Sequence, residues 1–436
     1  MSPEVQTADV LIIGGGVAGA STAMQLALRG IRVTVLERAM LGSGSTGRAA
    51  GLLGQLRSTR AATAMLRDGL GVVLDLEQRT GSEIFVETGS LRVASSPERV
   101  AEIDSHVALA HEVGLPIERL DQRRMAELLP YMRVDDLLDA CYCPTDGHLQ
   151  PAELLAGYVR VAREHGAVFR TQSPVEAVQI EAGRIRGLRA AGIEFSAPVV
   201  VNATGPWSYL VADRAGSRLP TAALGHYYLT TLPDDSMPVD RHSPAVRDRQ
   251  NRIYSRPEAG GLIVGMYEAE PVEYDMAALG PDFDMSAMRA RRDELNVALL
   301  LDAAGRRFPW IEPRTPMRIT TGIMTFTPDG QPLCGRDAQI EGLFHCAGFC
   351  GHGIVQSPTI GVIMAELITQ GQTRYDVAQI EADRFFEMEE LADRRVIEER
   401  CYATYAGYYG KVAATDVARD AAPDTAPDAA GDSASG

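Results

Sequence analysis

The N-terminal part of the chain has the clearest pattern of apolar runs and polar breaks. Residues 10–13 and 31–36 are short apolar runs, separated by a glycine-rich turn and a helical pattern that starts near Val17. Apolar runs of this length, bounded by glycine, predict strands that are buried on both faces, as in a parallel sheet. We therefore expect a strand–helix–strand unit within residues 8–60.

The rest of the chain predicts further helices and strands. Apolar residues recur at helical spacing in three segments, residues 98–113, 151–165 and 285–301. A long charged helix is expected over 374–409, and another helix from Ile354 onward. Strand patterns occupy four segments, residues 168–189 with a turn at Gly183, 198–201, much of 224–266, and 343–347. Residues 413–436 are rich in Ala, Asp and Pro without aromatic residues, which predicts a disordered tail.

Length and composition limit the class of protein. The chain has 436 residues, which favours two closely packed domains over a single core. Hydrophobic residues make up 45% and charged residues 23%, as in ordinary globular proteins. No stretch approaches the roughly 20 apolar residues of a membrane span, and the N-terminus lacks the basic segment of a signal peptide. These features predict a cytoplasmic protein without a membrane span.

Net charge and cysteine spacing limit the classes of ligand that the chain is expected to bind. A net charge of −16 argues against a nucleic-acid partner, because phosphate binding depends on clustered Lys and Arg. A small-molecule substrate is therefore the expected ligand. The six cysteines form no CxxC pair and no zinc ligand set, so free thiols and no metal site are expected.

The turn after the first apolar run carries a nucleotide-binding pattern. Gly14, Gly16 and Gly19 form GxGxxG between a predicted strand and a predicted helix. The first glycine permits a tight turn, the second lets the backbone approach a pyrophosphate, and the third allows close packing of helix on sheet. Glu37 ends the second strand, where its carboxylate can accept hydrogen bonds from the hydroxyls of a ribose. This combination predicts a dinucleotide site.

Two further segments favour FAD over NAD. GSGSTGRAAG, residues 42–51, is a loop of small residues that directly follows the second strand. VVVNATGPWS, residues 199–208, is an apolar strand that ends in small residues. Both can bring backbone close to a flat ring system. An NAD-dependent dehydrogenase is the alternative, but it leaves the loop GFCGHG, residues 348–353, without an explanation.

Seven blocks in the same order resemble the D-amino-acid-oxidase-like superfamily of FAD-dependent oxidoreductases. The blocks are GxGxxG, STGRAAG, NATGPWS, GHYYLTT (225–231), YSRPEAGGLIVGMYE (254–268), FTPDGQPLCG (326–335) and GLFHCAGFCGHGIVQSPTIG (342–361). The resemblance is closest to the FAD halves of dimethylglycine and sarcosine dehydrogenases and to the beta subunit of sarcosine oxidases. It implies an α/β protein in which a Rossmann-type FAD-binding domain is interleaved with an α+β substrate domain built on an antiparallel sheet, as in glycine oxidase.

The resemblance also implies a division of the chain. Residues 1–60, 150–215 and 320–372 would form the FAD-binding domain, and residues 61–149 and 216–319 the substrate domain. A C-terminal helix (373–412) and the tail (413–436) would follow. The relatives with histidyl FAD carry Trp-His where this chain has Gly47 and Arg48, and those with cysteinyl FAD carry cysteine at Gly322. We therefore expect non-covalent FAD.

Motif and resemblance together assign the cofactor site. The expected FAD-binding residues are Gly14, Gly16, Val17, Ala18, Gly19, Glu37, Arg38, Ser45, Thr46, Arg48, Ala49, Val175, Ala203, Thr204, Gly205, Trp207, Gly322, Asp329, Gly348, Gly351, His352, Gly353 and Ile354. The helix from Ile354 onward would direct backbone N–H groups at the flavin, whose reduced form carries negative charge.

The family reaction oxidises the carbon beside an amine nitrogen to an imine that water hydrolyses. His226 and Tyr254 match residues near the substrate in the dimethylglycine-oxidising relatives, and His352 lies in the predicted flavin loop, so these three are the candidate catalytic residues. Imidazole titrates near neutral pH and can accept a proton from an ammonium substrate. Arg57, Arg60 and Arg256 are candidates to bind a substrate carboxylate.

The resemblance leaves several functions open. The leading hypothesis is FAD-dependent oxidation of an N-substituted glycine or a related secondary or tertiary amino acid, such as sarcosine, dimethylglycine or an iminodiacetate-like compound. One alternative is a substrate-oxidising subunit of a hetero-oligomeric amine or proline dehydrogenase or sarcosine oxidase, with the aromatic segment CYATYAGYY (401–409) as a docking surface. Another is a D-amino acid or glycine oxidase or dehydrogenase. A homo-oligomer is compatible with each of these.

Overall fold

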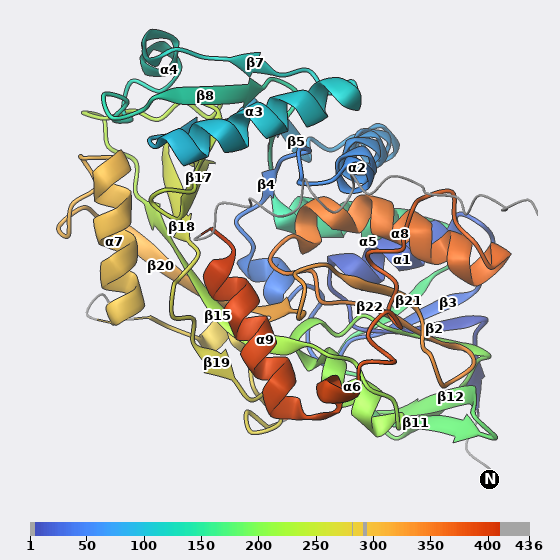
Figure 1. Ribbon diagram of the computed structural model, residues 1–436. Helices are drawn as coiled ribbons and strands as arrows, with labels where there is room; N and C mark the ends of the chain where they lie inside the picture. The colour runs from blue at the N-terminus through green and yellow to red at the C-terminus, as the bar shows by residue number, and fades with distance from the viewer. Residues whose placement is uncertain (1–4, 281, 291–293, 410–436) are drawn as a thin grey trace, which may run out of the picture.

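The computed structural model describes residues 5–280, 282–290 and 294–409. Figure 1 shows a sheet covered by helices on the right of the view, and a larger sheet on the left. The predicted tail and the end of the predicted C-terminal helix lie outside the described residues. No helix within the described ranges is both long enough and apolar enough to cross a membrane.

The first sheet has six strands drawn from distant parts of the chain. Their order is β10 (Val168–Arg170), β3 (Val33–Leu36), β2 (Val10–Ile13), β14 (Val199–Asn202), β22 (Leu343–Ala347) and β21 (Leu333–Arg336). All neighbours are parallel except β21 and β22. The strands expected at 10–13, 198–201 and 343–347 are therefore confirmed to within one residue, and the segment expected as strands over 168–189 contains β10 and two strands of another sheet, on either side of Gly183.

Strand β2 shows why its apolar run is continuous. Val10 and Ile12 pack into the core below the helices, whereas Leu11 and Ile13 pack toward a second, four-stranded sheet. Successive side chains of a strand point to opposite faces, so a strand covered on both sides needs apolar residues at every position. The result is a three-layer arrangement that holds the glycine turn after β2 in place.

Helices cover one face of the six-stranded sheet and the four-stranded sheet covers the other. The covering helices, which pack on one another, are α1 (Val17–Ala27), α2 (Arg60–Thr80), α5 (Pro151–Glu164) and α8 (Gly353–Gln370). The four-stranded sheet has the order β1 (Gln6–Thr7), β13 (Ile193–Ser196), β12 (Arg184–Ala190) and β11 (Val175–Glu181). A small sheet of β4 (Leu52–Leu53), β9 (Gly147–Leu149) and β5 (Phe85–Glu87) follows the early loop.

The second large sheet has nine strands. Their order is β19 (Glu273–Tyr274), β15 (Ala222–Thr231), β18 (Gly261–Met266), β17 (Ile253–Glu258), β16 (Ala245–Asp248), β6 (Ser90–Ala94), β8 (Asp139–Cys143) and β7 (Glu118–Arg119), with β20 (Met317–Phe326) paired to β15. Helices α3 (Pro97–Glu112) and α7 (Leu295–Arg307) pack against it, and α4 (Gln122–Leu128) lies near β7. β20 belongs to this sheet and starts before residue 320, so the predicted domain boundary there falls inside a strand.

Two predicted helices are wrong in extent. Instead of one helix over 285–301, the 3₁₀ turn η3 (Met285–Ala287) precedes α7, because the carboxylate of Asp284 accepts from Ser286 N and closes a single turn. Instead of one helix over 374–409, turns and η4 (Glu389–Ala392) precede α9 (Arg394–Gly407). In the segment before η4, the side chains of Ile380 and Phe385 are buried in the protein core, and the backbone forms turns there and no continuous helix.

Candidate active site

A large cavity lies between the two sheets. Its volume is about 1130 Å³, above the range of roughly 300–1,000 Å³ usual for small-molecule clefts. Its wall includes Gly14 and Glu37 from the six-stranded sheet, and His226, Tyr254 and Arg247 from the nine-stranded sheet. One cavity therefore joins the predicted dinucleotide site to the predicted catalytic residues.

The glycine turn is closely packed at the dinucleotide end. Gly14 has φ +110°, and a Cβ there would lie 2.4 Å from the carbonyl oxygen of Ala203. A Cβ on Gly19 would lie 2.1 Å from the carbonyl oxygen of Gly14. The turn therefore requires glycine at both positions, and α1 can begin directly behind it. Gly16, the N-cap residue of α1, has no side chain to cap the helix, and the Thr46 hydroxyl instead accepts from Val17 N at 3.1 Å.

Glu37 is fixed where a ribose would lie. One carboxylate oxygen accepts from Gly15 N at 2.8 Å, and the other accepts from Ala39 N at 2.9 Å. Each oxygen keeps a second lone pair that can accept from a ribose hydroxyl. Nearby, the guanidinium of Arg38 lies 4.1 Å from the ring centre of Trp207, so both flat groups form part of the cavity wall. The donors, the volume and the carboxylate all fit a bound dinucleotide.

Of the predicted FAD-binding residues, all but three lie on the cavity wall, and the exceptions are Gly19, Asp329 and Gly348. Gly19 serves the packing of α1 on the turn. A Cβ on Gly348, which has φ +70°, would lie 2.5 Å from Thr327 Cγ2, so this glycine serves close packing too. The structure thus does not place these residues against a cofactor.

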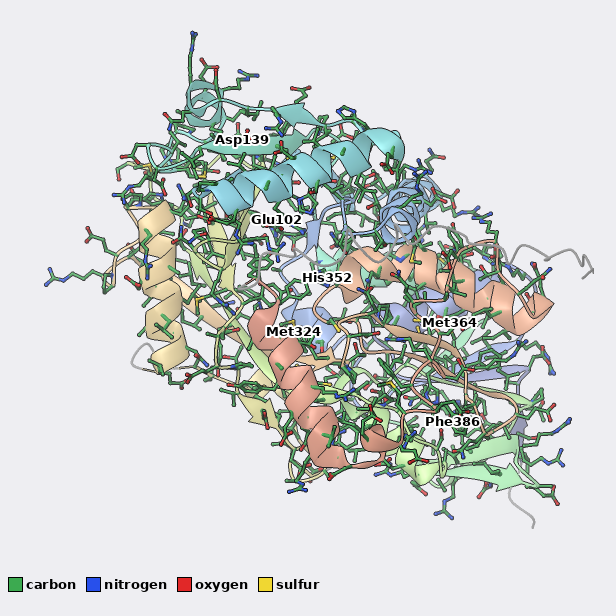
Figure 2. All side chains as sticks on the ribbon, viewed as in Figure 1. Glu102, Asp139, Met324, His352, Met364 and Phe386 are labelled. Atoms are coloured by element: carbon green, nitrogen blue, oxygen red, sulfur yellow. The ribbon has the colours of Figure 1, made fainter. Side chains whose placement is uncertain are left out.

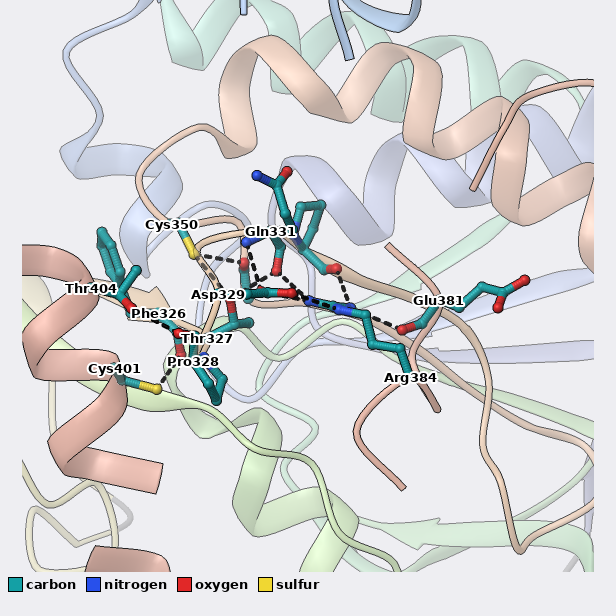
Figure 3. Close-up of polar contacts among 12 residues, drawn as sticks. Phe326, Thr327, Pro328, Asp329, Gln331, Cys350, Glu381, Arg384, Cys401 and Thr404 are labelled. Carbon is teal, nitrogen blue, oxygen red and sulfur yellow. Dashed lines mark hydrogen bonds and ion pairs between the residues drawn. The ribbon is translucent and has the colours of Figure 1, made fainter. Parts of the chain in front are cut away.

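Asp329 has a different partner. Its carboxylate binds the guanidinium of Arg384 at 2.8 and 2.9 Å and accepts from Gln331 N at 3.0 Å (Figure 3). In the same turn, the hydroxyl of Thr404 on α9 donates to Pro328 O at 2.8 Å (Figure 3). Asp329 therefore holds the turn between β20 and β21, on which the C-terminal segment packs.

The loop before α8 forms the opposite end of the cavity. Gly351, His352 and Gly353 lie on its wall, as does Met324, and Figure 2 labels His352 and Met324 near the centre of the molecule. Burial, reinforced by two nearby arginines, holds the pKa of His352 well below its ordinary value. The imidazole is therefore neutral, and its Nε2 lies within hydrogen-bond distance, 2.9 Å, of the Tyr408 hydroxyl. His352 is the N-cap of α8, and its side chain makes no capping bond, which leaves the first N–H groups of the helix for a ligand.

The nine-stranded sheet brings one row of side chains to this end. His226 on β15 is opposite Gly322 on β20, Tyr254 on β17 is opposite Arg247 on β16, and Arg247 is in turn opposite Arg92 on β6. Residues directly opposite one another project from the same face of a sheet. The register therefore gathers Tyr254, Arg247 and Arg92 on one face, although they are far apart in sequence.

His226 is held on both sides by hydrogen bonds. Its Nε2 lies 2.7 Å from the Tyr254 hydroxyl. Its Nδ1 lies 2.9 Å from the Tyr405 hydroxyl and 3.2 Å from a carboxylate oxygen of Glu268. Tyr405 also donates to that oxygen, and Tyr227 N donates to the other at 3.1 Å. Glu268 and Tyr405 are both 0% exposed, so this network excludes bulk water.

Tyr254 connects His226 to the cavity. Burial, together with the facing Tyr228 and Glu268, raises the pKa of Tyr254 well above its ordinary value. The phenol therefore stays protonated and can donate to a neutral His226. Gly265 makes this contact possible, because a Cβ there would lie 2.1 Å from the Tyr254 ring.

The predicted substrate arginines have three different surroundings. Arg57 lies on the cavity wall, and its Nε and Nη2 are buried without a hydrogen-bond acceptor among the described residues. Arg60 lies off the wall, where it pairs with Glu112 at 2.8 Å on the surface. Arg256 is 2% exposed, and its guanidinium donates hydrogen bonds to Ala50 O, Pro257 O and the carboxylate of Glu258. Neither Arg60 nor Arg256 has donors directed at the cavity, so both expectations are corrected.

Sequence reasoning missed four residues of this site. Glu268 ends one of the blocks that carried the resemblance, and its position two residues after an apolar strand was the available signal. Tyr405 and Tyr408 lie in the aromatic segment that was considered a docking surface, and they instead pack against His226 and His352. Arg247 gave no local signal, because its position depends on strand pairing.

Comparison with known proteins agrees with this geometry. A sequence model of the family described as FAD dependent oxidoreductase, DAO, matches residues 9–367. Human mitochondrial sarcosine dehydrogenase is 31% identical over 428 residues, which cover 95% of this chain and 45% of the dehydrogenase. This chain thus spans about half the length of that relative.

This chain also matches two solved structures over nearly the whole length of each of them. L-Proline dehydrogenase from P. horikoshii is 26% identical with a TM-score of 0.78, and the match covers 88% of this chain and 99% of that one. Glycine oxidase from Geobacillus kaustophilus is 27% identical with a TM-score of 0.73, over 87% of this chain and 99% of that one.

Proposed function

The chain belongs to the DAO family of FAD-dependent oxidoreductases, and we propose that it oxidises the C–N bond of an N-substituted glycine or a related secondary or tertiary amino acid. Family membership confirms the predicted fold class and the FAD cofactor. Its non-covalent attachment remains a prediction. The observation that carries the proposed reaction is the chain of hydrogen bonds from Tyr254 through His226 to buried Glu268, on the wall of the cofactor cavity.

The reaction requires an acceptor for electrons and an acceptor for a proton. When bound, FAD would supply the acceptor for a hydride equivalent from the carbon beside the nitrogen, so that this C–H bond breaks and the C–N single bond becomes the C=N bond of an imine. Water then hydrolyses the imine to an amine and a carbonyl compound. An ammonium substrate has no free electron pair on nitrogen, so it must first lose a proton within the site.

The His226 network is suited to accept that proton. The substrate proton would pass to the Tyr254 oxygen while the Tyr254 proton passes to His226 Nε2. The imidazolium that forms would be stabilised by Glu268 and Tyr405 on its Nδ1 side, at 3.2 and 2.9 Å. A general base placed in this way contributes about 10²–10⁴-fold to a rate. His352 is less suited to this role, because burial and two arginines disfavour its protonated form.

The decisive test is anaerobic addition of amines to the flavin-loaded protein while its visible spectrum is recorded. Sarcosine, dimethylglycine, iminodiacetate and D-amino acids are added separately. One N-substituted glycine should bleach the flavin bands, and His226→Gln should keep the bands but slow bleaching by about 10²-fold or more. A visible flavin that no N-substituted glycine bleaches would overturn the proposal, and bleaching by D-amino acids alone would favour the oxidase alternative.

The partner-subunit alternative receives no support from the aromatic segment. Tyr405 is fully buried against His226, and Tyr408 bonds His352, so these side chains are used within the chain. Tyr409 lies on the cavity wall. The segment that suggested a docking surface therefore belongs to the proposed active site.

A further inference from the structure

Three arginines gather beside the reaction end of the cavity. Arg92 and Arg247 are opposite one another on β6 and β16. Arg57 joins them from the early loop, since Arg57 Nη1 and Arg92 Nη2 donate to the same acceptor, Leu56 O, at 2.9 and 2.6 Å. Within the described part of the chain, none of the three forms an ion pair with a carboxylate.

The described residues do not balance the charges of these three arginines. Asp146 is the carboxylate that faces the three arginines, but its oxygens accept from Gln55 N at 2.9 Å and from the Ser90 hydroxyl at 2.6 Å. One carboxylate thus opposes three guanidinium groups. Burial, and then the nearby Arg247, lowers the pKa of Arg57 to about 10, so Arg57 is still charged at neutral pH.

Two of these cations can reach a ligand. Arg57 and Arg247 lie on the cavity wall, whereas Arg92 lies behind them and off the wall. Arg57 has two buried nitrogens without an acceptor. The guanidinium of Arg247 makes no hydrogen bond to a described residue, and Gly54 leaves room for it, since a Cβ there would lie 2.8 Å from Arg247 Nη2. Arg57 and Arg247 are both half-buried, so their like charges are only partly screened by solvent, and a bound anion would relieve the repulsion between them.

Strand register places these cations next to the amine site. Arg247 is directly opposite Tyr254, and paired residues have Cβ atoms about 4.5–5.5 Å apart. Tyr254 in turn bonds His226 at 2.7 Å. A substrate nitrogen near Tyr254 would therefore lie beside Arg247, and Arg57 lines the same cavity.

We propose that the substrate carries two carboxylate groups, one bound by Arg247 and the other by Arg57. This inference rests on the proposed amine oxidation and specifies its substrate class as amine dicarboxylates, compounds of the iminodiacetate type, rather than simple N-methylglycines. A single carboxylate would neutralise one of the two cations and leave the other without a partner. Arginine suits this role because its planar fork binds a carboxylate with two parallel hydrogen bonds.

A matched pair of thioethers tests the inference on the flavin-loaded protein. Thiodiacetate has two carboxylates and (methylthio)acetate has one, and in both a sulfur replaces the amine nitrogen, so neither can form an imine. Binding is measured from the shift of the flavin spectrum and from the rise in Tm. Thiodiacetate should bind about tenfold more tightly or better at low salt, and added salt should weaken this preference.

Two variants and a control assign the preference to residues. Arg247→Gln and Arg57→Gln should each reduce the preference for thiodiacetate to about twofold or less. Arg60→Gln, at the exposed start of α2, should leave both dissociation constants unchanged. If a variant fails to fold, the salt dependence of the unaltered protein still decides, because a contact with two charges weakens more steeply than a contact with one.

The outcomes separate this inference from the proposed reaction. Equal binding of the two thioethers to the unaltered protein overturns the dicarboxylate assignment, even if sarcosine bleaches the flavin. Tight binding of thiodiacetate without bleaching by any amine supports the anion site and overturns the reaction. Loss of the preference in Arg60→Gln as well would refute the assignment to Arg247 and Arg57.

Discussion

Removing the hydroxyl of Tyr405 should slow flavin reduction without changing the cofactor site. The ring is fully buried and would remain in Tyr405→Phe, so the core around α9 stays filled. What disappears is the contact of 2.9 Å with His226 Nδ1 and the bond to Glu268. Glu268 keeps Tyr227 N at 3.1 Å and His226 at 3.2 Å, so no buried carboxylate is left without a donor.

The size of the effect follows from these contacts. The orientation of the imidazole would then depend on one long bond to Glu268, in place of two bonds on that side. Loss of one such hydrogen bond costs about 1–1.5 kcal/mol, which is about five- to tenfold in the limiting rate of flavin reduction. Because Tyr405 is not on the cavity wall, the amine concentration that gives half the limiting rate should change little.

Anaerobic stopped-flow measurement of flavin bleaching, expressed per bound flavin, checks this prediction. Tyr402→Phe is the matched control, because Tyr402 is also on α9 but makes no hydrogen bond to His226 or Glu268. A second check combines Tyr405→Phe with Tyr254→Phe, whose effects should not be additive because both act through His226. A Tyr405→Phe rate within twofold of the unaltered protein, with only a lower Tm, would refute the positioning role.

Three further predictions concern packing, pH and buried charge. Gly265→Ala would place a Cβ 2.1 Å from the Tyr254 ring, so bleaching should slow by about tenfold while the flavin spectrum is kept, and an unchanged rate would contradict this. Burial, with nearby arginines, lowers the pKa of His106 to about 2. Below about pH 6.5 only the unfolded state then takes up this proton, and His106 alone should lower the free energy of unfolding by about 2 kcal/mol between pH 7 and pH 5. Urea unfolding should show a smaller fall in His106→Gln, and an equal fall would refute this. Arg307→Met would leave Asp248, now paired at 2.8 Å and 0% exposed, without its cation, and urea unfolding should show a loss of about 3–5 kcal/mol.

The cofactor end could be predicted from the sequence because its determinants are local. The turn at Gly14, the start of α1 near Val17 and the acid at Glu37 lie within one strand–helix–strand unit, and each residue type follows from the backbone geometry there. The same holds for the loop before α8, where glycines and His352 precede the helix. The spacing of such residues along the sequence is enough to predict their positions, because these positions do not depend on how distant strands pair.

The reaction end could be predicted only in part, because it depends on long-range register. Arg247 reaches Tyr254 only when β16 pairs with β17, and a shift of one residue would send it to the other face of the sheet. The error with Arg256 has the same origin. Its residue type suits a carboxylate, but its place in the sheet directs it to Ala50 O and Glu258. Residue type therefore identifies candidates, and register decides among them.

The C-terminal segment shows that the two ends of the cavity are determined differently. The family sequence model stops at residue 367, before α9 begins, yet α9 supplies the Tyr405 hydroxyl to His226, and Tyr408, just after it, bonds His352. Arg249 and Arg252 donate to the backbone carbonyls of Tyr408 and Ala406, at 2.8 and 2.7 Å, and so hold this segment over the nine-stranded sheet. The segment that the family model matches thus includes the cofactor end of the cavity, whereas the proposed proton acceptor also needs contacts from α9, which lies beyond residue 367. Changes in α9 should therefore alter the rate of amine oxidation while FAD binding is kept.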